Sequence, residues 1–255
     1  PSLGGILTVI SYSAAFFIAA SGMILYGVLI ALLAVETIPK KSSTQNIVQT
    51  FRGYIHVISD RPFLSYVVIF ILVQMSSVFM WVLLPVYAHD QFNILENKYS
   101  LLPTTNAIMV VLFQVLVTLK TRKYPPLPVM ALGSLLYAIG VGSIAIGGNL
   151  YAFWVSMVVM TIGELILMPT ASTYVAQLAP ADMRGRYMSI AGLTWNVAYG
   201  IAPITGGFLS DTIAPRAIWF GGLVTGLAAC FGYVILYKHQ PKGDLDQALK
   251  NIEIH

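Results

Sequence analysis

The chain has 255 residues, of which 57% are apolar and 9% are charged, and its mean hydropathy is +0.79. An ordinary soluble domain carries about 25% charged residues and must cover a large wet surface, so this composition excludes a soluble globular protein. The net charge of +4 does not indicate a nucleic-acid partner, because the basic residues lie in short loops rather than in one patch.

Seven apolar runs are long enough to cross a bilayer, whose hydrocarbon core of about 30 Å needs about 20 helical residues. The alternating pattern of a membrane β-barrel is absent, so the sequence predicts an all-α integral membrane protein. The first residues, Pro1 to Thr8, are too short to span and are expected to end a preceding helix. The seven runs are Ala14 to Val35, Phe63 to Ala88, Leu101 to Leu119, Leu127 to Gly147, Leu150 to Tyr174, Met188 to Leu209 and Ile218 to Tyr237.

The longest connection, Glu36 to Pro62, is polar but contains apolar residues at helical spacing. Two interpretations stay open: a solvated linker, or a helix lying along the inner membrane surface. Pro62 suits the first turn of the next span, and one of Ser42 to Thr44 is expected to cap the helix. The apolar residues of the connection are Ile47, Val48, Phe51, Ile55 and Ile58.

Lys and Arg residues are distributed unevenly between the two sides that alternate connections define. One side holds 12 of the 14, and the other holds only Lys98 and Arg216. Cytoplasmic loops carry the excess of Lys and Arg, so we expect Lys120 to Lys123, Asp182 to Arg186 and the C-terminus to lie in the cytoplasm. The expected location is the inner membrane of the cell, crossed several times.

A seven-residue pattern occurs twice, as Pro1-Ser-Leu-Gly-Gly-Ile-Leu and, 202 residues later, as Pro203-Ile-Thr-Gly-Gly-Phe-Leu. Each copy is followed by an apolar span, which indicates an internal duplication. Pro203 lies 140 residues after Phe63, so a first unit of equal size would begin about four helices before the chain does. We expect the repeated residues to let helices pack closely; they are Pro1, Gly4, Gly5, Pro203, Gly206 and Gly207.

These residues resemble the major facilitator superfamily, in particular its bacterial drug:proton antiporters, whose fifth helix carries a G-P-x-x-G-G pattern. The segments Thr161 to Pro169 and Leu178 to Met188 look like the tenth helix and the following loop of bacterial efflux members and proton-coupled peptide transporters. The loop Lys120 to Pro126 is basic but lacks the family's G-x-x-x-D-R pattern. The resemblance implies that the chain runs from the end of helix 5 to helix 12 of a twelve-helix fold.

Four segments follow from this resemblance. Residues 1–35 would end the N-terminal half, 36–62 would form the central cytoplasmic loop with an amphipathic helix, 63–237 would form the C-terminal six-helix half, and 238–255 would be a cytoplasmic tail. The full-length protein is expected to be a monomer.

Acids and carboxamides inside the spans occur in four of the seven runs. The resemblance implies that these four, the second, third, fifth and sixth runs, line a central cavity, while the others face lipid. Polar groups in hydrocarbon are costly unless they face a bundle interior or water. Taken singly, however, each amide more often forms a hydrogen bond between two helices. The residues expected to line the cavity are Gln74, Trp81, Asn106, Phe113, Gln114, Thr161, Trp195, Asn196 and Tyr199.

Glu164 is the only ionisable residue in the interior of any run. Burial there favours its neutral form, so it is a candidate for coupling to a proton or to substrate, the alternative being a structural acid. Asp182, Arg184 and Arg186 form a candidate cytoplasmic gate, or simply belong to the positive inner side.

The sequence therefore predicts a secondary active transporter that exports a small amphipathic compound in exchange for protons by alternating access. The alternatives are a proton-coupled uptake carrier for peptides or sugars, and a non-transporting receptor or scaffold. An enzyme is not expected, because the spans contain no paired catalytic constellation. The expected partners are the lipid bilayer, a small-molecule substrate and protons, with no nucleic acid. Because the one cysteine, Cys230, and four scattered histidines offer no ligand cluster, no metal and no cofactor are expected.

Overall fold

The computed structural model describes residues 11–33 and 47–239, and within these residues it contains helices and no strand. The predicted all-α fold is confirmed, and each predicted run falls on one helix or one continuous helical stretch as far as the described residues reach. The elements are α2 (Tyr12–Leu33), α3 (Ile47–Ser59), α4 (Arg61–Val78), the π-helical turn η1 (Phe79–Leu83), α5 (Leu84–Phe92), α6 (Glu96–Tyr99), α7 (Leu101–Thr121), α8 (Pro126–Ser143), the 3-10 turn η2 (Ile144–Ile146), α9 (Leu150–Leu178), α10 (Arg184–Thr212) and α11 (Ala217–His239).

Six helical stretches of the described chain have the length and apolar composition needed to cross a membrane. The helix α10 is 29 residues long but is not among the six, because it carries charges near both ends and polar residues such as Asn196 along its length. The seventh span therefore stays a prediction. The six stretches are Ser13–Leu33, Arg61–Phe92, Glu96–Thr121, Pro126–Ile146, Leu150–Leu178 and Ala217–His239.

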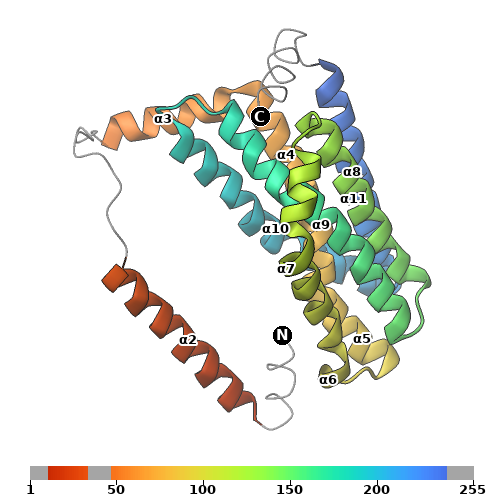
Figure 1. The fold of residues 1–255 in the computed structure, drawn as a ribbon. Coiled ribbons are helices and arrows are strands. Elements are labelled where there is room, and N and C mark those ends of the chain that lie inside the picture. The colour runs from red at the N-terminus through yellow and green to blue at the C-terminus, as the bar shows by residue number, and fades with distance from the viewer. Residues whose placement is uncertain (1–10, 34–46, 240–255) are drawn as a thin grey trace.

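The helices from α4 onward form a bundle whose spatial order differs from the chain order. Going round the bundle, neighbours pack in the order α10, α4, α11, α8, α9, α7. Figure 1 shows α3 and the starts of α4 and α10 at one end, and α5 and α6 at the other. Large apolar side chains such as Val111, Phe208 and Val224 are exposed on the outside of the bundle, as expected when lipid replaces water as the solvent.

The helix α8 packs on both α9 and α11 and leaves its remaining side exposed. Small residues allow the contact. A Cβ atom on Gly163 of α9 would lie 2.8 Å from the carbonyl oxygen of Gly133 on α8, a distance that side chains do not tolerate. The buried side of α8 includes Tyr137, whereas Leu132 and Ile139 are exposed.

The second predicted run contains a local widening of the helix at η1. Pro85 follows this turn and has no N–H to bond the carbonyl of Trp81, four residues earlier, which accounts for a π-turn at this point. Gly206 of α10 packs here, because a Cβ atom on it would collide with Leu83 and lie 3.0 Å from the Phe79 ring.

The other residues of the repeated pattern are placed differently. Pro203 lies inside α10, and a Cβ atom on Gly207 would meet nothing within 4 Å, so no close helix contact forms at Gly207 among the described residues. Pro1, Gly4 and Gly5 lie outside the described residues, as do Ser42 to Thr44.

The predicted helix in the long connection is present as α3, which packs on α4 and α10. Val57 is fully buried, whereas Ile55 and Ile58 of the apolar stripe are exposed. Asp60 then caps α4, since its Oδ1 accepts a hydrogen bond from the backbone N–H of Phe63 at 3.2 Å, and Pro62 lies in the first turn as expected.

Candidate functional site

The helices α7 and α9 are joined by a cluster of Asn106, in the second turn of α7, with Thr161 and Glu164, near the middle of α9. The Asn106 amide donates to the Thr161 hydroxyl at 3.0 Å and to the Glu164 carboxylate at 2.7 Å. Thr161 in turn donates to the Met157 carbonyl one turn earlier, at 2.8 Å. Asn106 and Thr161 are buried, and Glu164 is half-buried. The structure thus brings together three of the predicted site residues.

No basic side chain occupies the central part of any described membrane-length helix; Lys120 and Lys238, for example, lie at helix ends. The Glu164 carboxylate therefore has a neutral amide as its hydrogen-bond donor rather than a counter-charge. An ionised carboxylate without a counter-charge is costly in a desolvated place.

Gln114 is half-buried and bonds to α9. Its Nε2 donates to the carbonyl oxygen of Leu165 at 3.1 Å. Pro169, four residues later, lacks the N–H that would otherwise bond this carbonyl. A third link lies toward the start of α7, where the Trp154 indole donates to the Thr105 hydroxyl at 2.8 Å. Gln114 thus has a structural contact that fixes α7 against α9.

Gln74 is fully buried on α4, and both polar atoms of its amide lack a partner among the described residues. The hydroxyls of Ser77, on the same helix, and of Tyr137, on α8, are also buried and interact with each other. The Tyr137 hydroxyl lies close to Ser77 and within electrostatic range of Glu164. Sequence reasoning missed Tyr137, because the census of polar residues counted acids and carboxamides and left out hydroxyl groups.

The predicted aromatic residues form a separate group. Trp195 and Tyr199 of α10 contact each other with ring centroids 5.6 Å apart, and Trp195 and Trp81 pack against the same apolar cluster. Asn196 and Tyr199 are exposed, as is Phe113 on α7. The predicted cavity residues therefore divide into a buried polar group between α4, α7, α8 and α9 and an exposed group on α7 and α10.

The candidate gate lies at the end of the bundle that carries α3. Asp182 and Arg184 are exposed, and the guanidinium of Arg186 lies against Gly53 of α3. The adjacent Tyr187 donates a hydrogen bond to Asp60 Oδ2 at 2.6 Å. Burial and this bond raise the pKa of Tyr187 to about 12. The start of α10 is thus tied to the linker helix and to the start of α4.

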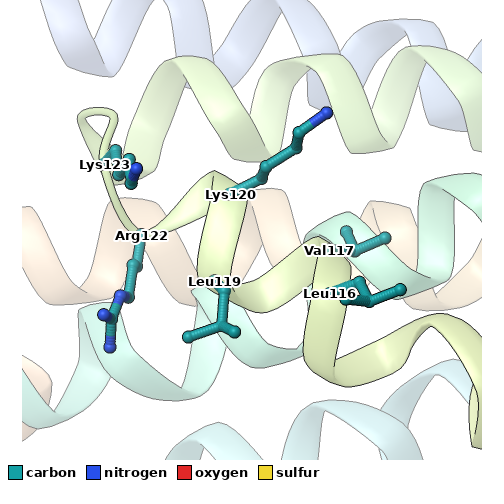
Figure 2. Close-up of a pocket in the computed structure, with 6 residues that line it drawn as sticks. All are labelled: Leu116, Val117, Leu119, Lys120, Arg122 and Lys123. Atoms are coloured by element: carbon teal, nitrogen blue, oxygen red, sulfur yellow. The ribbon is translucent and has the colours of Figure 1, made fainter.

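An open depression of about 660 Å³ lies at the far end of α7 and in the turn after it (Figure 2). Asn106 is 14 residues from Lys120, or about 21 Å along a helix, so this depression is separate from the polar cluster. Figure 2 shows Lys120 and Arg122 pointing away from each other. The lining residues are Leu116, Val117, Leu119, Lys120, Arg122 and Lys123.

Comparison with known proteins gives consistent matches. The family model described as Major Facilitator Superfamily matches residues 67–252. The chain is 26% identical over 205 residues to a Na(+), Li(+), K(+)/H(+) antiporter of Planococcus maritimus, covering 73% of this chain and 46% of that protein. It is 24% identical over 237 residues to multidrug resistance protein MdtH of Citrobacter koseri, covering 90% of this chain and 58% of that protein.

Solved structures agree on the fold. A POT family transporter crystallised with a thioalcohol-conjugated peptide superposes with a TM-score of 0.59 at 17% identity, covering 93% of this chain and 53% of that chain. A POT family transporter bound to 5-aminolevulinic acid superposes with a TM-score of 0.54 at 19% identity, covering 93% of this chain and 51% of that chain. The chain spans about half the length of the relatives it matches.

Proposed function

The chain belongs to the major facilitator superfamily, and we propose that the protein containing it is a secondary active transporter that exports a small amphipathic compound in exchange for protons. The observation that carries this proposal is the 2.7 Å hydrogen bond from Asn106 to Glu164, in a cluster that has no basic partner among residues 11–33 and 47–239. A membrane carboxylate that lacks a counter-charge alternates most readily between a protonated state and a state neutralised by a bound cation.

The cluster also connects the carboxylate to helix movement. Asn106 belongs to α7, which packs on α9 and, at its start, on the short helix α6. The Asn106 amide donates to a carboxylate more strongly than to a neutral acid, so protonation of Glu164 weakens the bond between α7 and α9. Proton binding thereby changes the stability of one helix contact, which is the requirement for coupling to alternating access.

The exposed aromatic and amide residues of α7 and α10 suit a substrate of mixed polarity. Phe113, Trp195 and Tyr199 offer apolar surface, and Asn196 offers a hydrogen bond for orientation. In transporters built from parallel repeats the substrate site lies between the two halves. Since the chain spans about half the length of its relatives, we assign to it one wall of such a site. The name of the MdtH relative, a multidrug resistance protein, supports export of such compounds.

A second candidate is exchange of an inorganic monovalent cation for protons. The relative from Planococcus maritimus is named for this activity, and the same carboxylate serves it. Two further alternatives are proton-coupled uptake, in which substrate moves into the cell, and a non-transporting receptor, which moves no substrate. The protein is proposed to lie in the cell membrane as a monomer, with the C-terminus in the cytoplasm.

Transport by the complete protein in inside-out vesicles separates these candidates. After an inward-acidic pH gradient is imposed, the proposal predicts uptake of fluorescent amphipathic cations into the vesicles, which corresponds to export from the cell. The variant Asn106→Leu should retain membrane insertion and show slower uptake. Proton-driven sodium movement without dye movement would favour the second candidate, and the absence of any flux would support a receptor.

A further inference from the structure

Three basic side chains without a partner lie at the end of α7 and in the turn that leads to α8. They are Lys120, Arg122 and Lys123, all exposed, and none of their side chains forms a hydrogen bond or ion pair with any residue that the structure describes. No acidic residue occurs between Glu96 and Glu164 in the sequence. The N-terminus of α8 has no side-chain cap, so the dipole of this helix adds to the positive potential. The turn therefore carries an uncompensated positive charge that attracts anions.

Exposed leucines continue from these cations along one side of α7. Leu112, Leu116 and Leu119 are all exposed, and their spacing of four and then three residues puts them on the same side of the helix. Lys120 follows Leu116 by four residues, or about 6 Å along the helix axis. Because α7 belongs to a stretch of membrane-spanning length that ends at Thr121, the leucines lie at the depth of lipid acyl chains and Lys120 lies at the depth of the headgroups.

The open depression at the end of α7 joins these two features, because its lining contains Leu116, Leu119 and the three basic residues. Figure 2 shows Lys120 and Arg122 pointing away from each other, whereas a free phosphate ion is held by donors that converge on it. Separated cations beside an apolar wall suit a ligand that carries both a phosphate group and acyl chains. The exposed side chain of Tyr124 lies just beyond, and tyrosine is enriched at the level of lipid headgroups.

We infer that the end of α7 and the following turn bind an anionic phospholipid. Its phosphate contacts Lys120, Arg122 and Lys123, and an acyl chain lies along Leu116 and Leu119. The site lies at the end of the bundle that carries α3 (Figure 1), which is the end proposed to face the cytoplasm. Anionic lipids attract basic segments, and each Lys or Arg near the membrane surface contributes about a fivefold gain in affinity. The inference is independent of the proposed proton coupling.

Lipid binding to the complete protein tests the inference directly. The protein, purified in detergent, is titrated with phosphatidylglycerol or with phosphatidylcholine, and bound lipid is measured by native mass spectrometry. The wild type should bind phosphatidylglycerol more tightly than phosphatidylcholine. The double variant Lys120→Gln/Lys123→Gln should weaken the affinity for phosphatidylglycerol about 10- to 30-fold and leave that for phosphatidylcholine unchanged. Leu116→Ser should weaken the affinity for both lipids, because an acyl chain loses apolar contact.

Arg61→Gln/Lys238→Gln is the matched control, because it removes the same charge from exposed residues of α4 and α11 at the same end of the bundle. It should leave the affinity for phosphatidylglycerol nearly unchanged. Equal losses for the two double variants, or equal binding of the two lipids by the wild type, would overturn the inference.

Two further outcomes would also overturn it. Displacement of phosphatidylglycerol by inorganic phosphate would show a site for free anions rather than for a lipid. A lower melting temperature of Lys120→Gln/Lys123→Gln in detergent without lipid would show that these cations pair with carboxylates elsewhere in the complete protein. The inference predicts neither displacement by phosphate nor a loss of stability without lipid.

Discussion

Gln114 donates a hydrogen bond to the carbonyl oxygen of Leu165 at 3.1 Å, and this is the carbonyl that Pro169 leaves without its helical partner. Gln114 on α7 thus supplies a donor to a carbonyl that has no hydrogen-bond partner within α9. This contact is at the residue next to Glu164, so it also fixes the position of the helix segment that carries the proposed coupling residue.

Replacing Gln114 should therefore destabilise the protein in a way that depends on Pro169. Gln114→Ala leaves the Leu165 carbonyl unpaired and should lower the free energy of unfolding by about 1–3 kcal/mol. In a Pro169→Ala background the restored N–H bonds the carbonyl, so the same change should cost less than half as much. Thermal unfolding of the four proteins in detergent, followed by tryptophan fluorescence, gives the double-mutant cycle. Equal costs in both backgrounds would show that the two residues are independent.

Adjacent glycines of α10 should respond oppositely to alanine. Gly206→Ala forces a methyl group against Leu83 and Phe79 and should destabilise the protein by about 1–3 kcal/mol. Gly207→Ala meets open space and should be neutral or stabilising by up to about 1 kcal/mol, because alanine favours a helix. The apparent melting temperature of each variant provides the measurement. Similar losses for both would mean that Gly207 packs against a part of the protein outside the described residues.

The hydrogen bond from Tyr187 to Asp60 should stabilise the junction of α10 and α4. The pKa of Tyr187 in the folded protein, about 12, exceeds the ordinary tyrosine value of 10. The stabilisation is therefore fully present below about pH 10 and is lost as the pH rises through 12. Tyr187→Phe should cost about 1.5–3 kcal/mol at neutral pH. The difference in stability between wild type and variant, measured from pH 8 to pH 12, should shrink at the alkaline end; a difference that stays constant would refute this assignment.

Orientation is tested by labelling single cysteines. In a background with Cys230 replaced, cysteines at Asn97 and Lys123 should react oppositely with an impermeant thiol reagent on intact cells, the first being labelled and the second protected. This expectation comes from the uneven distribution of Lys and Arg. Labelling of both positions, or protection of the first alone, would reject the proposed topology.

Apolar run length was enough to predict the helices, because the bilayer thickness fixes the number of residues in a span. The uniqueness of Glu164 likewise singled out a carboxylate that the structure places in a hydrogen-bonded cluster between α7 and α9. The sequence could not show that Gln114 pairs with a carbonyl freed by Pro169, because that contact joins helices far apart in the chain. The position of the Tyr137 ring between α8 and α9 likewise depends on the close approach of Gly133 and Gly163, which no local pattern reveals.

The central claim, that Glu164 couples substrate movement to protons, is tested most directly by comparing two transport modes in the complete protein with Glu164→Gln. This change keeps the shape and most hydrogen bonds of the side chain but removes its ability to ionise. In reconstituted vesicles, transport of a fluorescent amphipathic cation driven by a pH gradient should fall to the level of empty vesicles, while exchange of labelled for unlabelled compound without a gradient should continue. Transport driven by the pH gradient at the wild-type rate in the Glu164→Gln variant would contradict the account.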